Sequence, residues 1–378
     1  MSTPAARPYT LNVPDAQIAD LKNRLALTRW PDEPPLEPWS TGTSLAYMKA
    51  LTEYWRTSFD WRRWEKTLNG FRQFTVPIGG IDLHFIHEPG RSRDAMPLLI
   101  SHGWPGSVLE FHKLIPLLRE HFTVIAPSLP GYTLSFAPGQ KRFGVEEIAD
   151  LYATLMCDVL GYPRFGAQGG DWGAFIASVL AHRYPERLTG IHLNLLAVRR
   201  DGRLAQNAAA EAKTFLAQLN HFLKEETGYQ WIQGTKPQTL AFALTDSPTG
   251  LAAWIVEKFR TWTDCDGNPE SAVSREEMLA NISLYWFTGA IGSAFWPYYA
   301  RMHGPWPIPE GRSIGVPMGY AAFPKEILAP PRSLAEQTYA DIRRWSVMVK
   351  GGHFAALEQP DALAREVVAF FAELRDNP

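Results

Sequence analysis

The sequence predicts an α/β protein with a mostly parallel, eight-stranded sheet, helices on both faces, an inserted helical cap and an N-terminal extension. Three observations support this prediction. Short apolar runs typical of strands alternate with helical patterns. A glycine-rich turn that carries Asp171 joins one of these runs to a helix. Between Leu195 and about Arg312 the strand-like runs stop, and helical, aromatic-rich sequence follows. The eight expected strands are Gln73 to Pro77, Ile81 to His87, Pro97 to Ser101, Thr123 to Ala126, Arg164 to Gln168, Leu188 to Asn194, Gly315 to Phe323 and Trp345 to Lys350.

This order of elements divides the chain into three parts. Residues 71–195 and 313–378 are expected to form the core, residues 196–312 a helical cap or lid after the sixth strand, and residues 1–70 an extension that packs on both. The extension should begin with a helix near Asp15, because Ile18, Leu21 and Leu25 then share one face.

The composition excludes several other classes of protein. The 378 residues are 46% hydrophobic, enough for a large core, and the formal net charge of −2 leaves no basic surface for nucleic acid. Cys157 and Cys265 are too few for a disulfide framework or a cysteine-based metal site, so we expect reduced thiols. No signal-sequence pattern and no run of about 18 apolar residues occurs, so we expect a cytoplasmic protein without membrane attachment.

The run Gly169-Gly170-Asp171-Trp172-Gly173 is the first candidate for catalysis. A strained turn of this kind between a strand and a helix lifts a nucleophile above a sheet, and small flanking residues allow the turn to close. Here the nucleophile would be the Asp171 carboxylate, which can attack an sp³ carbon and leave an ester that water can cleave. The alternative is ordinary turn chemistry, because Asp is common in glycine-rich turns.

A second loop supports the catalytic interpretation. The expected strand Pro97 to Ser101 runs directly into His102-Gly103-Trp104-Pro105-Gly106-Ser107. The backbone N–H groups of Trp104 and Trp172 could together hold an oxyanion, because one such donor follows the nucleophile and the other comes from the loop after an earlier strand. A simple turn built from Gly and Pro is the alternative.

A histidine and an acid complete the candidate set. His353 follows the last expected strand, as the order nucleophile, acid, histidine requires. A neutral imidazole, with an ordinary pKa of about 6.5, can take a proton from water, although this histidine could also be a simple loop residue. Glu326, after the seventh expected strand, should orient His353 unless it is a solvated charge at a helix start. Asp341 is nearer in sequence, but it lies in a helix-like stretch from Leu334 to Arg344.

The segments H-G-W-P-G-S, G-G-D-W-G, F-P-x-E and G-G-H-F-A-A-L-E together resemble the microsomal-type epoxide hydrolases. This branch of the α/β-hydrolase superfamily includes juvenile-hormone epoxide hydrolases and soluble microbial relatives. Residues 8–88 resemble its N-terminal region, and Ser247 to Trp262 with Leu284 to Gly289 resembles its cap. The resemblance implies the α/β-hydrolase fold, an epoxide-opening Asp171, a Glu326 and His353 pair that activates water, and two cap tyrosines on the epoxide oxygen. It also leads us to expect a homodimer.

The chemistry of epoxide opening explains why tyrosines are needed. An opened oxirane is a strongly basic alkoxide, so a phenol with an ordinary pKa of about 10 can donate a hydrogen bond or a proton to it. The matching positions are Tyr229 and Tyr298. Tyr299 is an alternative to Tyr298, because Pro297 precedes an adjacent tyrosine pair and a shift of one residue would swap their directions. All three tyrosines could instead be packing residues.

We therefore predict an epoxide hydrolase that forms a vicinal diol in two steps, without a metal or organic cofactor. Asp171 forms an ester with an oxirane carbon, and water activated by His353 hydrolyses it, so the partners are a small epoxide and water. The 14 Trp, 20 Phe and 13 Tyr favour an aryl or lipophilic epoxide. A haloalkane dehalogenase with the same Asp-His-acid set is one alternative, although a departing halide needs no proton from tyrosine. A catalytically silent hydrolase fold that binds a hydrophobic ligand or partner is the other.

Overall fold

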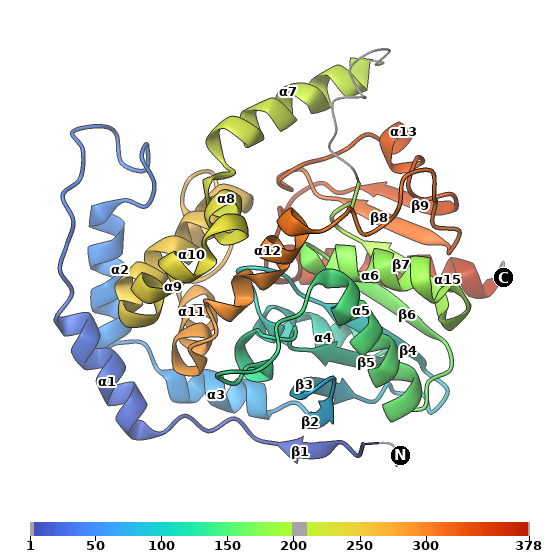
Figure 1. The fold of residues 1–378 in the computed structure, drawn as a ribbon, viewed down its shortest axis with the longest axis horizontal. Helices are drawn as coiled ribbons and strands as arrows, with labels where there is room; N and C mark the ends of the chain where they lie inside the picture. The colour runs from blue at the N-terminus through green and yellow to red at the C-terminus, as the bar shows by residue number, and fades with distance from the viewer. Residues whose placement is uncertain (1–3, 199–209, 377–378) are drawn as a thin grey trace.

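A nine-stranded sheet forms the centre of the computed structural model, which describes residues 4–198 and 210–376 (Figure 1). The strands are β1 (Arg7–Tyr9), β2 (Gln73–Ile78), β3 (Ile81–Glu88), β4 (Met96–Ser101), β5 (Phe122–Pro127), β6 (Phe165–Gly169), β7 (Leu188–Leu193), β8 (Met318–Ala322) and β9 (Ile342–Val347). Their order across the sheet is β1-β2-β3-β5-β4-β6-β7-β8-β9. Neighbours from β5 to β9 run parallel, and β1, β2 and β3 are joined antiparallel at one edge. The predicted α/β-hydrolase class is therefore confirmed.

The expected number of eight strands is wrong by one. The additional strand, β1, is a three-residue edge strand that pairs antiparallel with β2. Three residues are too few to show the alternation that marks a strand in sequence, and Pro8 in its middle argues against a strand. The other strands lie close to their expected positions, except that β8 begins at Met318 and not at Gly315, and that β9 spans Ile342–Val347 and not Trp345 to Lys350.

The stretch from Leu334 to Arg344 is not a helix, which corrects a second expectation. Only α13 (Arg332–Ala335) is helical there, and Asp341 immediately precedes β9, where its carboxylate pairs with Arg343 at 2.6 Å. Because β9 is the other edge strand, charged residues interrupt the continuous apolar run that marks a buried strand.

Parallel pairing brings the predicted catalytic loops to the same ends of the strands, namely their carboxyl ends. Ser101 of β4 lies beside Gly169 of β6, and Gly169 lies beside Leu193 of β7. Leu193 in turn lies beside Tyr320 of β8. The loops that follow β4, β6 and β8 therefore all leave the sheet at the carboxyl ends of its parallel strands, where open α/β sheets bind their ligands.

Helices cover both faces of the sheet. α6 (Trp172–Arg183) packs on β4, β6 and β7, whereas α15 (Pro360–Asp376) packs on β7, β8 and β9 from behind in Figure 1. The other helices of this part are α4 (Leu114–Leu118), α5 (Val145–Ala153) and α14 (Ala355–Glu358). Cys157 lies in the π-helical turn that continues α5, and both it and Cys265 are free thiols.

Helices joined by loops make up the described part of the segment between β7 and β8. Its helices are α7 (Ala210–Glu225), α8 (Gly228–Thr235), α9 (Pro237–Asp246), α10 (Pro248–Trp262), α11 (Arg275–Thr288) and α12 (Trp296–His303). The helices of the N-terminal segment are α1 (Asp15–Ala26), α2 (Leu45–Thr57) and α3 (Trp61–Asn69). α1 and α2 contact α10, and α3 contacts α11. Because β1 belongs to the sheet, the N-terminal segment joins the sheet to these helices.

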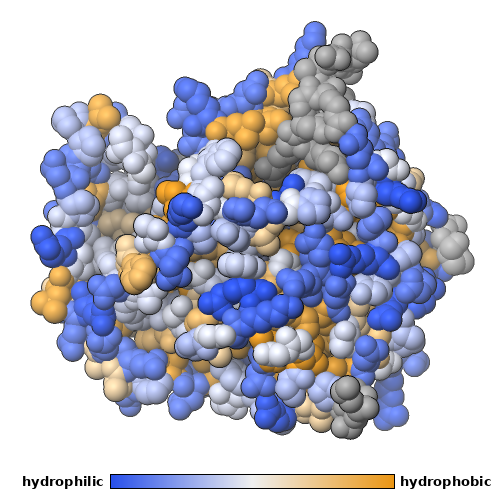
Figure 2. Space-filling view, viewed as in Figure 1, coloured by the Kyte–Doolittle hydropathy of each residue, from blue (hydrophilic) through white to orange (hydrophobic). Residues whose placement is uncertain are grey.

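The described residues contain no candidate membrane-spanning helix. No helix within residues 4–198 and 210–376 combines the length and the apolar sequence needed to cross a bilayer. Figure 2 shows hydrophilic residues spread over one face of the molecule, with hydrophobic residues among them.

Candidate active site

Asp171 lies in a strained turn between β6 and α6. Its backbone has a φ of 47° and a ψ of −127°. An L-residue at such angles costs about 1–3 kcal/mol and is stable only when its surroundings fix it. Close packing fixes it here, because a Cβ on Gly173 would lie 2.0 Å from the carbonyl oxygen of Ser101. A Cβ on Gly169 would lie 2.2 Å from the backbone of Gly173. The first and last glycines of G-G-D-W-G, Gly169 and Gly173, are therefore required by the geometry of the turn.

The loop after β4 encloses the Asp171 carboxylate. The backbone N–H of Trp104 donates a hydrogen bond to Oδ1 of Asp171 at 2.7 Å. A Cβ on Gly103 would lie 2.1 Å from the same oxygen, so a side chain there would displace it. The N–H of Trp172 begins α6, where amide groups have no partner within the helix. Both predicted oxyanion donors therefore lie next to Asp171. Trp104 contacts its carboxylate, and Trp172 follows it in the sequence.

His353 and Glu326 form a buried hydrogen-bonded pair beside Asp171. Nδ1 of His353 donates to Oε1 of Glu326 at 2.6 Å, and Nε2 lies 3.5 Å from Oδ2 of Asp171. The two loops that carry this pair meet through the N–H of Lys325, which donates to the carbonyl of Gly351 at 3.1 Å. This contact between segments far apart in the sequence sets Glu326 opposite His353.

The two carboxylates determine the charge of the imidazole. Burial alone would lower the pKa of His353, but Glu326 and Asp171 outweigh it and raise this pKa well above its ordinary value. His353 is therefore protonated near neutral pH while both carboxylates are charged. Neutralising Asp171 would remove one of the two charges that hold this proton, and the pKa of His353 would fall.

Tyr229 of α8 and Tyr298 of α12 lie together over the nucleophile turn. Their ring centroids are 5.6 Å apart, and the Tyr298 ring lies 4.8 Å from the ring of Trp172. The buried Tyr298 hydroxyl has no hydrogen-bond partner among the described residues. Burial, together with Tyr229 and the Asp171 charge, raises the pKa of Tyr298 well above its ordinary value. This phenol therefore keeps its proton and can act as a donor.

The neighbouring Tyr299 points away from this pair. Its ring stacks on His303 at 4.0 Å and on Trp296 at 4.9 Å between centroids. Both partners belong to α12, where consecutive side chains are separated by about 100° around the axis. The geometry therefore brings Tyr298, and not Tyr299, next to Tyr229.

Asp171, Tyr229 and Tyr298 line one cavity of about 200 Å³. Its walls also contain aromatic side chains from α6 and from the segment between β7 and β8, namely Trp172, Phe175, Phe222 and Trp306. A small, largely apolar cavity with a few convergent polar groups suits a hydrophobic small molecule.

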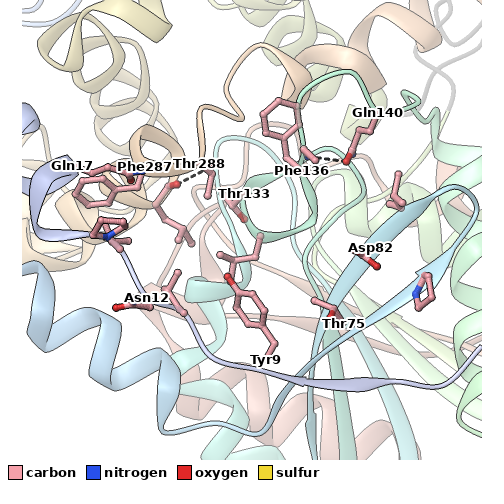
Figure 3. Close-up of a pocket in the computed structure, with 18 of the residues that line it drawn as sticks. Tyr9, Asn12, Gln17, Thr75, Asp82, Thr133, Phe136, Gln140, Phe287 and Thr288 are labelled. Atoms are coloured by element: carbon pink, nitrogen blue, oxygen red, sulfur yellow. Dashed lines mark hydrogen bonds between the residues drawn. The ribbon is translucent and has the colours of Figure 1, made fainter.

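Two larger cavities occur among the described residues, and Tyr229 lines one of them, of about 960 Å³. A cavity of about 850 Å³ lies between the N-terminal segment, β2, β3 and the loop that contains Thr133, and none of the predicted site residues lines it (Figure 3). Within residues 4–198 and 210–376, no three His, Cys, Asp or Glu side chains are grouped so that they could hold a metal ion.

The sequence patterns do not single out two charged residues that lie near the site. Glu110 sits in the 3₁₀ turn Val108–His112, which follows the loop that holds Asp171. Lys258 of α10 is buried, and its Nζ lies 4.6 Å from the centroid of the Tyr229 ring. A carboxylate within the apolar run Val108 to Phe111 is the signal that could have pointed to Glu110.

Comparison with known proteins places these features in a family. Residues 6–111 match the family model of the epoxide hydrolase N terminus, and residues 96–360 match that of the alpha/beta hydrolase fold. Epoxide hydrolase 1 of Oryctolagus cuniculus is 39% identical over 406 residues, which cover 96% of this chain and 88% of the relative. The epoxide hydrolase of Aspergillus niger is similar with a TM-score of 0.86 and 32% identity, covering 99% of this chain and 97% of that one. The juvenile hormone epoxide hydrolase of Bombyx mori has a TM-score of 0.88 and 30% identity, covering 99% and 95%.

Proposed function

The chain belongs to the epoxide hydrolases that combine an α/β-hydrolase fold with the epoxide hydrolase N-terminal region, and we propose how its residues carry out the reaction. It is a hydrolase that adds water to the ether bond of an epoxide. The observation that supports our mechanism is the position of Asp171, which adjoins a backbone donor, a buried imidazole and a phenol without a hydrogen-bond partner among the described residues.

In the first step, the Asp171 carboxylate attacks an oxirane carbon. Oδ1 accepts a hydrogen bond from Trp104, which leaves Oδ2 as the attacking atom. The C–O bond of the epoxide breaks as the new ester bond forms, and Tyr229 and Tyr298 donate to the oxygen that gains charge. The alkoxide leaves this step as a hydroxyl, and the phenol recovers its proton from His353 through water, so His353 becomes neutral.

In the second step, water hydrolyses the ester. His353 takes one proton of the water while the hydroxyl adds to the Cγ of Asp171, and the oxyanion rests on the amides of Trp104 and Trp172. Each such donor contributes roughly 2.7–4 kcal/mol to the transition state. The ester bond then breaks, the diol oxygen takes the proton from His353, and the carboxylic acid left at Asp171 gives its proton to His353, so that the carboxylate and the protonated imidazole are restored. The oxygen of the water therefore remains in Asp171.

The paired tyrosines favour an epoxide over a haloalkane as the substrate. A departing halide needs no proton, whereas an opened epoxide requires a donor. Tyr298 supports this assignment because its phenol is buried and protonated beside Asp171. The aromatic walls of the cavity support our proposal that the substrate is an aryl or lipophilic epoxide.

Single turnover of styrene oxide in ¹⁸O-labelled water tests this mechanism. The expected result is one ¹⁸O in the peptide that contains Asp171 and unlabelled diol from the first turnover. Asp171→Ala should form neither diol nor ester, and His353→Gln should accumulate the ester, as intact-protein mass spectrometry can detect. Direct transfer of ¹⁸O into the first diol would contradict an ester intermediate.

We also propose the division of the chain into an extension (1–70), a core (71–195 and 313–378) and a cap (196–312). The contacts of α1 and α2 with α10 support a role for the extension in holding the cap. The family resemblance and the two free thiols lead us to propose a cytoplasmic homodimer. Sedimentation velocity of the purified protein and fractionation of the cells that produce it test these two proposals.

A further inference from the structure

A second and much smaller cavity borders Asp171. Its volume is about 20 Å³, and Asp171 is the only lining residue that it shares with the cavity of Tyr229 and Tyr298. His353 and Glu110 also line it. A cavity needs about 10–15 Å³ to hold one water molecule, so this one has room for a single water next to the nucleophile and the base.

The fold directs the Glu110 carboxylate into this region. A Cβ on Gly106 would lie only 1.3 Å from Oε1 of Glu110, so the carboxylate occupies the space that any side chain at position 106 would fill. The backbone of Ser107 also forms a hydrogen bond with the Glu110 carboxylate. Glu110 is partly buried, and it makes no ion pair within the described parts of the chain.

Helix α11 keeps the loop below Glu110 in place. The Nδ2 of Asn281 donates to the carbonyl of Pro105 at 2.8 Å, and the hydroxyl of Tyr285 donates to the carbonyl of Gly106 at 2.6 Å. Both α11 side chains are buried. The space left by Gly106 and the hydrogen bonds from α11 to the loop therefore both fix the position of the Glu110 side chain. A reactant is held in place in this way when its surroundings are rigid.

We propose that Glu110 holds the hydrolytic water between His353 and the Cγ of Asp171 during hydrolysis of the ester. The inference rests on the two-step function proposed above and assigns Glu110 to the second step alone. The water donates one hydrogen to a carboxyl oxygen of Glu110 and the other to Nε2 of His353. Only the proton on His353 is transferred, so Glu110 is a positioning residue.

The charges around Glu110 fit this assignment. Burial raises the pKa of Glu110 to about 8, His353 lowers it, and the Asp171 charge raises it. A carboxyl oxygen of Glu110 can accept a hydrogen bond from water whether or not the group is protonated.

Glu110→Gln tests the inference if the two steps are timed separately. Ester formation and decay from styrene oxide are followed by acid quench and mass spectrometry of the Asp171 peptide. We expect ester formation within about twofold of the wild type and ester decay about 10- to 100-fold slower. Gly106→Ala should give the same slow decay, because its methyl group would displace the carboxylate without removing it. Gly315→Ala is the matched control, since no atom lies within 4 Å of its added Cβ.

The outcomes separate this inference from the mechanism on which it rests. Ester decay at the wild-type rate in Glu110→Gln and Gly106→Ala would overturn the role of Glu110 while leaving the ester mechanism intact. Equal slowing of both steps would also overturn it, because that pattern indicates a general structural defect. If wild-type protein forms no ester, the proposed mechanism fails, and the role of Glu110 fails with it.

Discussion

Replacement of Tyr298 by Phe should slow epoxide opening without loss of stability. The Tyr298 hydroxyl is buried and has no partner at normal hydrogen-bond geometry among the described residues, so its removal breaks only a weak contact with Trp172. Burial of an unpaired hydroxyl costs about 1–3 kcal/mol, so the melting temperature of Tyr298→Phe should equal or exceed that of the wild type. Loss of activity would then be chemical in origin.

The expected loss of rate in Tyr298→Phe depends on how many phenols donate to the epoxide oxygen. General-acid help is typically about 100- to 10,000-fold. If Tyr229 and Tyr298 share it equally, loss of one phenol should reduce the rate of ester formation by roughly 10- to 100-fold, or about 1.4–2.7 kcal/mol. The rate can be measured from tryptophan fluorescence during single turnover, because Trp104 and Trp172 adjoin Asp171.

Tyr299→Phe is the matched control for this experiment. It removes the same hydroxyl from the next residue of α12, whose ring stacks on His303 outside the cavity. Its ester formation should match the wild type. Slow ester formation in Tyr299→Phe with a normal rate in Tyr298→Phe would refute the reasoning and reverse the assignment of the two tyrosines.

Two further predictions concern the acid and the nucleophile turn. Glu326→Gln removes a charge that raises the pKa of His353, so the acid limb of the pH profile for ester hydrolysis should move to lower pH, while the plateau falls about 100- to 10,000-fold. An unchanged acid limb in stopped-flow measurements would contradict this coupling. Gly173→Ala would place a Cβ 2.0 Å from the carbonyl oxygen of Ser101, so it should lower the free energy of unfolding by about 3 kcal/mol, whereas Gly315→Ala should change it little in urea titration. Equal stability of the two variants would show that the turn can relax.

The buried strands could be predicted from the sequence because burial gives them continuous apolar runs. β4 to β7 lie inside the sheet, and their expected positions agree closely with the observed ones. The edge strands follow another rule. β1 is short and contains Pro8, and β9 contains Arg343 and Arg344, so neither shows the pattern of a buried strand. The expectation of a helix at Asp341 is wrong for the same reason, because the charged residues of the edge strand β9 hide the pattern of a strand.

The catalytic loops could be predicted because their residue types are constrained by local geometry. The turn around Asp171 admits only glycine at Gly173, so its pattern is visible in the sequence. Glu110 is different, because its position depends on the missing side chain of Gly106 and on hydrogen bonds from α11. These contacts join segments far apart in the chain, and no local pattern records them.

The charges of the site suggest why the two steps of the proposed mechanism occur in order. Before the substrate reacts, Asp171 and Glu326 together hold a proton on His353, so the imidazole cannot act as a base. Esterification neutralises Asp171, which lowers the pKa of His353. One event therefore releases the base. Hydrolysis restores the Asp171 charge and returns His353 to its protonated resting state. In this mechanism the nucleophile itself controls when the water-activating imidazole can work.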